Sequence, residues 1–245
     1  MLVALIGVVV GIAVGATGVG AGILTVPLLV MLAGKSAVES VGAALLFSTV
    51  IKTLAAGQYQ LRGQVDWRTL GCLSLGGVPG VMAGSLFLKE LNEESLRYAL
   101  LAVGATVTLT AALSLAQSLH NAQNGRWRLK LLGAVSFLLG IQVGFSSSGA
   151  GALGCIALFH FTPLSSAAVV GTDLAYGLVL SATGGLMHVK FSGWQTSLLL
   201  QLLAGGVLGV LTGTQIATII STRRLRQVIL IWAAVLGAIM VYNTL

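Results

Sequence analysis

The chain has 245 residues, of which 56% are hydrophobic and only 8% are charged, and its formal net charge is +7. Soluble domains carry about a quarter charged residues, so this composition excludes an ordinary water-soluble fold. Three long uncharged stretches cover residues 1–34, 131–172 and 191–222. Each exceeds the roughly 20 apolar residues that a spanning helix needs, and none shows the two-residue alternation of a membrane β-barrel. The composition therefore predicts an all-α, polytopic membrane protein.

The basic residues and the two cysteines do not indicate a nucleic-acid or metal site. Positive charge lies in short clusters between apolar runs, as in the cytoplasmic loops of membrane proteins, rather than on one soluble face. Cys72 and Cys155 lie far apart within apolar segments, where they suit packing positions better than a disulfide or a zinc site. We expect no metal, no cofactor and no nucleic-acid partner.

Ten apolar segments follow one another along the chain, separated by charged residues, Gly, Pro and Asn. They cover residues 2–16, 20–34, 37–60, 67–88, 93–118, 127–144, 150–161, 164–188, 193–220 and 225–243. We expect the first segment, which starts at Met1, to be retained in the membrane rather than removed as a signal peptide. The short segments 2–16, 20–34, 127–144 and 150–161 either cross the bilayer or re-enter it, which gives eight to ten transmembrane or half-membrane helices.

The order short, short, long, long, long occurs twice, which indicates a duplication. The first membrane repeat covers residues 1–120, the second 126–245, and a short loop at 119–126 connects them. Glycines recur at an offset of 129 positions: Gly15, Gly20, Gly22, Gly42, Gly80 and Gly84 correspond to Gly144, Gly149, Gly151, Gly171, Gly209 and Gly213. An odd number of crossings per repeat would invert the second copy, as in many secondary transporters.

Positive charge gives an expected orientation for these segments. If both or neither of the short segments of each repeat cross, eight basic residues fall on one side: Arg62, Arg68, Arg126, Arg128, Lys130, Arg223, Arg224 and Arg226. Four fall on the other: Lys35, Lys89, Arg97 and Lys190. This division favours the first side as cytoplasmic, with both ends of the chain outside. The alternative, in which one short segment of each pair crosses, divides the charges six to six.

Two glycine-rich junctions are the sharpest motif. The first runs Gly15-Ala-Thr-Gly-Val-Gly-Ala-Gly-Ile-Leu-Thr-Val-Pro27, and Gly144-Phe-Ser-Ser-Ser-Gly-Ala-Gly echoes it. A helix break at each junction would expose the amides of the next half-helix, which attract anions together with nearby hydroxyl groups. The predicted substrate-binding residues are Thr17, Gly18, Gly20, Gly22, Ser146, Ser147, Ser148, Gly149 and Gly151. The alternative interpretation is that these glycines only let helices pack closely.

Two charged residues, Lys52 and Asp173, fall inside long apolar segments that are equivalent in the two repeats. Each costs on the order of 3 kcal/mol at a helix centre, so a paired or functional role is expected. Lys52 either supplies charge to an anionic substrate, pairs with Asp173, or snorkels to the membrane surface; Asp173 either pairs with Lys52 or carries a coupled proton. The predicted gate residues are Gln58, Tyr59, Thr172, Tyr176 and His188, with a headgroup position as the alternative for Gln58, Tyr59 and His188.

The order of the motifs resembles that of a known family. Gly18-Val-Gly-Ala-Gly-Ile-Leu-Thr-Val-Pro27 is followed by Val41-Gly42, by Gly63-Gln-Val-Asp66-Trp67-Arg68, and by Gly76-Gly-Val-Pro79-Gly80. In this order, and with Gly171-Thr172 and Gly193-Trp194 in the second half, the chain resembles the sulfite exporter (TauE/SafE) family of bacterial inner-membrane proteins. The second copy departs from the pattern, since it has serines in place of a fully glycine-rich run and lacks the following proline.

The resemblance implies a membrane transporter, most often an exporter, of a small sulfur-containing anion such as sulfite or an organosulfonate. We expect alternating access around a site near the bilayer midplane, with Asp173 either carrying a coupled proton or holding Lys52, and with the anion, the lipid bilayer and a second copy of the chain as partners. The alternatives are a channel or cation-coupled carrier, and a non-transporting membrane assembly factor. No enzyme is expected, because the sequence has no nucleophile elbow and no soluble catalytic domain.

Overall fold

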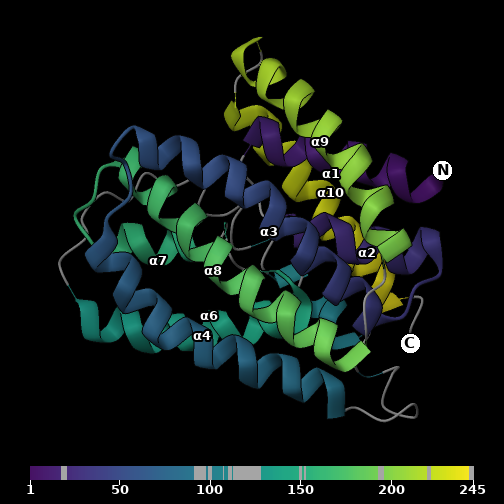
Figure 1. Ribbon diagram of the computed structural model, residues 1–245, viewed down its shortest axis with the longest axis horizontal. Helices are drawn as coiled ribbons and strands as arrows, with labels where there is room; N and C mark the ends of the chain where they lie inside the picture. The colour runs from purple at the N-terminus through teal and green to yellow at the C-terminus, as the bar shows by residue number, and fades with distance from the viewer. Residues whose placement is uncertain are drawn as a thin grey trace.

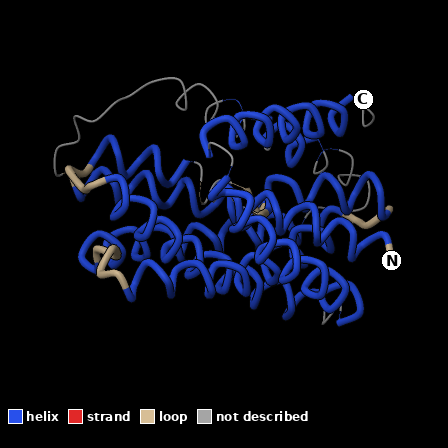
Figure 2. The backbone as a smooth tube through the Cα atoms, turned by 90° about the horizontal axis from the view of Figure 1, so that it is seen from above, coloured by secondary structure: helices blue, strands red, loops and turns tan. Residues whose placement is uncertain are grey.

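The computed structural model describes residues 1–17, 21–90, 98, 101–106, 108–109, 112, 128–148, 151, 153–192, 196–219 and 222–242. Within these residues all regular structure is helical, and the described loops are short (Figure 2). The helices are α1 (Leu2–Thr17), α2 (Gly22–Ala33), α3 (Ala37–Leu61), α4 (Trp67–Glu90), α6 (Leu129–Ser146), α7 (Leu153–Phe161), α8 (Ser166–Ser192), α9 (Thr196–Ile219) and α10 (Thr222–Tyr242). The predicted all-α class is confirmed. The predicted segment at 93–118 and the loop at 119–126 lie largely outside the described residues.

Four helices of the described part, namely α3, α4, α8 and α9, are long and apolar enough to cross a membrane. Large apolar side chains such as Leu75, Leu138 and Leu208 point outward from the bundle, as a lipid-facing surface requires. In contrast, α2 has 12 residues and α7 has nine. At 1.5 Å per residue they extend only about 18 and about 14 Å, well short of a hydrocarbon core about 30 Å thick. The protein is therefore a multi-pass membrane protein in which α2 and α7 are too short to cross the hydrocarbon core.

Helices α3 and α8 lie side by side at the centre of the bundle (Figure 1). Gly42 near the start of α3 contacts His188 near the end of α8, and Gly171 near the start of α8 contacts Tyr59 near the end of α3. The two helices therefore run antiparallel. These two contacts are the same contact made twice, because Gly171 and His188 follow Gly42 and Tyr59 by 129 positions.

Two further helix pairs, α1 with α9 and α4 with α6, pack through glycines and run parallel. A Cβ atom on Gly11 would overlap the carbonyl oxygen of Gly206, and one on Gly140 would overlap that of Gly77. The offset of 129 positions relates these contacts too, because Gly140 is equivalent to Gly11 and Gly206 is equivalent to Gly77. Small residues at such interfaces let helix backbones approach closely, which is how helices associate in lipid.

The same packing explains Gly15 and Gly144. Both were expected at helix breaks, but α1 continues through Gly15 to Thr17 and α6 continues through Gly144 to Ser146. A Cβ atom on Gly15 would lie 3.0 Å from the Cα atom of Val210, and one on Gly144 would overlap the carbonyl oxygen of Val81. For these two glycines, close helix packing is the correct interpretation.

The repeated contacts support the predicted duplication, and the antiparallel course of α3 and α8 supports an inverted second copy, which we keep as a proposal. Each repeat lends a helix to the other, since α1 packs against α9 and α6 packs against α4. The repeats are therefore interlocked around α3 and α8 rather than separated into two bodies. This arrangement brings the two helix breaks toward the same central helices.

Candidate functional site

Both predicted junctions contain a helix break. The first lies between Thr17, where α1 ends, and Gly22, where α2 begins; the second lies between Ser146, where α6 ends, and Leu153, where α7 begins. Of the predicted site residues, Gly18, Gly20 and Gly149 lie outside the described residues, and Thr17 is described only as the helical end of α1. Whether these junctions bind a substrate stays a prediction.

The two breaks meet in space. Gly22, the first residue of α2, lies so close to Ser147 that a Cβ atom on it would overlap both the backbone oxygen and the hydroxyl group of Ser147. Ser147 follows the last residue of α6. The start of a half-helix in the first repeat therefore contacts the end of the broken helix in the second.

The start of α2 is buried and has no side-chain cap. Ala21, at the N-cap position, makes no side-chain hydrogen bond to the first turn, and Ile23 and Leu24 are buried. Thr25 uses its hydroxyl within the helix, donating to the carbonyl oxygen of Ala21 at 2.8 Å. Amide groups in the first turn of a helix have no partner within it, and they carry the positive end of the helix dipole. A buried start without a cap therefore favours an anion.

Three consecutive serines, Ser146, Ser147 and Ser148, are buried beside this helix start. The hydroxyl of Ser146 donates to the carbonyl oxygen of Gln142 at 2.9 Å and lies 2.6 Å from that of Ser148. The hydroxyl of Ser147 is buried with no hydrogen-bond partner among the described residues. A buried hydroxyl in this state carries a desolvation cost that a bound ligand would remove.

The backbone of Ser147 is also unusual. Its φ of 57° and ψ of 4° are left-handed, and it is the only described residue other than glycine with a positive φ. Its amide donates to the carbonyl oxygen of Val143 at 2.8 Å and so closes the end of α6. A left-handed residue other than glycine costs on the order of 1–3 kcal/mol, and such residues cluster at ligand-binding sites. In this left-handed conformation the Ser147 hydroxyl lies against the start of α2.

Lys52 and Asp173 are both buried within the protein, with 5% and 2% of their surfaces exposed. The ammonium group of Lys52 lies against Gly177, one helical turn after Asp173 on the same face of α8. Lys52 interacts electrostatically with Asp173 and with Cys155. This burial excludes the alternative that Lys52 snorkels to the membrane surface.

The carboxylate of Asp173 lies at the start of α7. Its Oδ1 atom is so close to Gly154, the second residue of α7, that a Cβ atom there would overlap it. The first turn of α7 contains no acidic residue of its own. From the sequence, Cys155 was predicted only to be a packing residue and Gly154 was not identified, although both lie directly after the second junction.

The predicted gate residues have different surroundings. Thr172 accepts a hydrogen bond from the amide of Asp66 at 2.9 Å, and Tyr176 donates to the carbonyl oxygen of Ser136 at 3.0 Å, so both hold helices together. The Nε2 atom of His188 lies 3.4 Å from the carbonyl oxygen of Gly144, three residues before Ser147. At the other end of α3, Gln58 is exposed and Tyr59 is partly buried. A gating role for all five stays a prediction.

Comparison with known proteins agrees with the helical membrane architecture. The family model described as "Sulfite exporter TauE/SafE" matches residues 3–240. A protein of Bacillus subtilis (strain 168) named "Probable membrane transporter protein YjnA" is 29% identical over 237 residues, which cover 91% of this chain and 92% of that protein. No solved structure matches the chain.

Proposed function

The chain belongs to the sulfite exporter TauE/SafE family of membrane transporters, and we propose that it exports a small sulfur-containing anion, such as sulfite or an organosulfonate, by alternating access. The observation that carries this proposal is the contact between Gly22 and Ser147 at the uncapped, buried start of α2. We place the protein in the inner membrane of a bacterium.

The chemistry of the site fits an oxyanion. The oxygen atoms of sulfite or of a sulfonate group accept hydrogen bonds, and the donors at the start of α2 are backbone amides and the Ser147 hydroxyl. Helix starts bind such anions through their amides and dipole, and half-helices in the membrane serve this purpose in other transporters. Lys52 supplies positive charge in the same bundle, and Asp173 either holds Lys52 or carries a coupled proton.

Helix packing suggests which parts move. Glycines bring the backbones of α1 and α9, and those of α4 and α6, into close contact. In the proposed mechanism each pair moves as one unit. Each unit carries one of the broken helices, α1 or α6. Alternating access would follow if one unit rocks against the other about α3 and α8, and opens the contact between Gly22 and Ser147 to one side of the membrane at a time.

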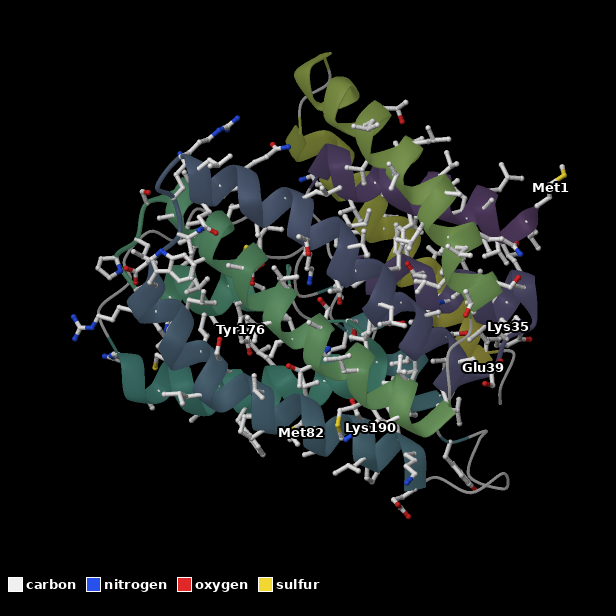
Figure 3. All side chains as sticks on the ribbon, viewed as in Figure 1. Met1, Lys35, Glu39, Met82, Tyr176 and Lys190 are labelled. Carbon is white, nitrogen blue, oxygen red and sulfur yellow. The ribbon has the colours of Figure 1, made fainter. Side chains whose placement is uncertain are left out.

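The orientation in the membrane follows from the directions of the helices. The end of α3 and the starts of α4, α6 and α10 lie at one end of the bundle, with Arg62, Arg68, Arg128, Lys130, Arg223, Arg224 and Arg226. Lys35, Lys89 and Lys190 lie at the other end; Figure 3 shows Lys35 toward the right of the view, on the same side as Met1. The positive-inside rule then places the arginine-rich end in the cytoplasm.

Anion currents test this function. The protein is reconstituted into proteoliposomes on a solid-supported membrane, and sulfite, sulfoacetate, sulfate and chloride are applied in turn. The proposal predicts saturable currents with sulfite or sulfoacetate. Currents that do not saturate would indicate a channel, and dependence on an imposed sodium gradient would indicate a cation-coupled carrier. Absence of flux together with co-purification of a stoichiometric partner would indicate an assembly factor.

A further inference from the structure

The starts of the two half-helices differ in one respect that bears on anion binding. At the start of α7, the carboxylate of Asp173 lies against Gly154 in the first helical turn. At the start of α2, the first turn has no acidic residue and no side-chain cap, and the backbone oxygen and the hydroxyl of Ser147 are the polar groups beside it. One helix start therefore has a carboxylate of the protein beside it, and the other has a carbonyl oxygen and a hydroxyl group.

The offset between the repeats shows where this difference arises. Position 44 corresponds to Asp173, and Ala44 is a fully buried residue of α3. Position 25 corresponds to Gly154, and Thr25 stands there with its hydroxyl bonded within α2. An aspartate on the central helix, facing a glycine that leaves room for its carboxylate, thus occurs in the second repeat and not in the first.

Lys52 adds to the asymmetry. Position 181 corresponds to Lys52, and Ser181 is buried and donates to the carbonyl oxygen of Leu178 at 3.2 Å. Lys52 and Asp173 therefore lie close together, and neither has a charged residue at the equivalent position of the other repeat. The ammonium group of Lys52 lies against α8 one helical turn from Asp173. It interacts electrostatically with the Asp173 carboxylate, which lies at the start of α7.

We infer that Asp173 is a built-in anion that occupies the start of α7, held there by Lys52, so that the transported anion binds at the start of α2 alone. This inference rests on the proposed function and deepens it. Asp173 is then a positioning residue, which compensates the dipole of α7 and the charge of Lys52 and does not touch the substrate. The two half-helix starts then have different roles: the start of α2, with Ser147 beside it, binds the substrate, and the start of α7 holds the carboxylate of Asp173.

A chemical rescue experiment tests the role of Asp173. Asp173→Ala removes the carboxylate and leaves room for a small one, so transport should fall at least about tenfold and formate should restore most of it. Asp173→Asn is the matched control, because its amide fills the same space without charge and formate should not rescue it. Chloride at equal ionic strength controls for screening. Failure of formate to rescue a folded Asp173→Ala protein would overturn the inference.

The equivalent position in the first repeat provides a second, independent test. In a Thr25→Gly background, which leaves the room that Gly154 leaves for Asp173, Ala44→Asp should bring a carboxylate to the start of α2 and abolish sulfite binding, whereas Ala44→Asn, with nearly the same volume, should retain most of it. Both variants are first checked for a monodisperse peak and for thermal stability in detergent. If Ala44→Asp binds sulfite as well as Ala44→Asn does, the start of α2 is not the anion site and the inference fails.

These outcomes separate the inference from the proposed function. If the unmodified protein carries no sulfite, sulfonate or other tested anion, the proposed function fails. If it does carry one, but formate leaves Asp173→Ala inactive and Ala44→Asp behaves like Ala44→Asn, only the division of roles fails. If Asp173→Ala does not fold, the comparison of the two Ala44 variants decides.

Discussion

Ser147 lies directly against Gly22, although one residue follows the last turn of α6 and the other begins α2. The contact joins the two helix breaks and places a strained, buried serine hydroxyl at an uncapped helix start. Neither break alone has this arrangement. The proposed anion site is therefore a property of how the two halves of the chain meet.

The absence of a side chain at position 22 should be essential. Gly22→Ala puts a methyl group into the backbone of Ser147, so we expect a loss of about 1–3 kcal/mol of stability, the usual cost of overpacking, and loss of transport. Gly57→Ala is the control, because nothing lies within 4 Å of a Cβ atom there; it should stabilise α3 by about 0.5–1 kcal/mol. Thermal unfolding in detergent and anion currents measure both. A Gly22→Ala protein with unchanged melting and currents would show that the contact is loose.

The hydroxyl of Ser147 should matter for affinity rather than for folding. Ser147→Gly removes the hydroxyl and also relieves the left-handed strain, so the protein should be as stable or more stable while its KM for the anion rises about tenfold, the effect of losing one good hydrogen bond. Thr183→Ala, which removes a hydroxyl bonded within α8, is the matched control. Concentration dependence of the anion current provides both KM values. An unchanged KM in Ser147→Gly would remove this hydroxyl from the site.

Lys52 and Asp173 should depend on one another. Lys52→Met leaves a buried carboxylate without its nearby cation, and we expect a loss of about 3 kcal/mol of stability and no anion transport. Adding Asp173→Asn should recover much of the stability, because both charges are then gone, but should not recover transport. Melting temperatures of the two single variants and the double variant form the test. If the two effects on stability simply add, the residues are not coupled.

Equivalent glycines of the two repeats should have equivalent effects. Gly11→Ala and Gly140→Ala each push a methyl group into the backbone of the partner helix, and each should cost about 1–3 kcal/mol. Gly71→Ala is the control, since a Cβ atom there meets nothing within 4 Å. Thermal unfolding of the three variants measures this. A large effect at one position and none at the other would contradict the proposed duplication.

Hydrophobic runs and their breaks were enough to predict the helices. The expected segments 2–16, 37–60 and 67–88 differ from α1, α3 and α4 by at most two residues at either end. In the second half the largest difference is at α8, which ends at Ser192 rather than at residue 188. The segments 20–34 and 150–161, which contain α2 and α7, were also recognisable as short from the sequence.

The sequence could not separate glycines that pack from glycines that mark breaks. Gly15 and Gly22 belong to one motif, yet Gly15 packs within α1 against α9 and Gly22 begins α2. What decides their roles is the partner helix, which is distant in the sequence. The contact of Asp173 with Gly154 was missed for the same reason, although the difference between Thr25 and Gly154 at equivalent positions was a visible signal.

The central claim, that an anion binds where the start of α2 meets Ser147, is tested most directly by locating a bound anion. Selenite is a heavier analogue of sulfite, and anomalous diffraction from crystals grown with it would mark the selenium position. We predict a single strong peak within hydrogen-bonding distance of the Ser147 hydroxyl and the first amides of α2. A peak at the start of α7 instead, beside Asp173, or no peak at either helix start, would contradict the account.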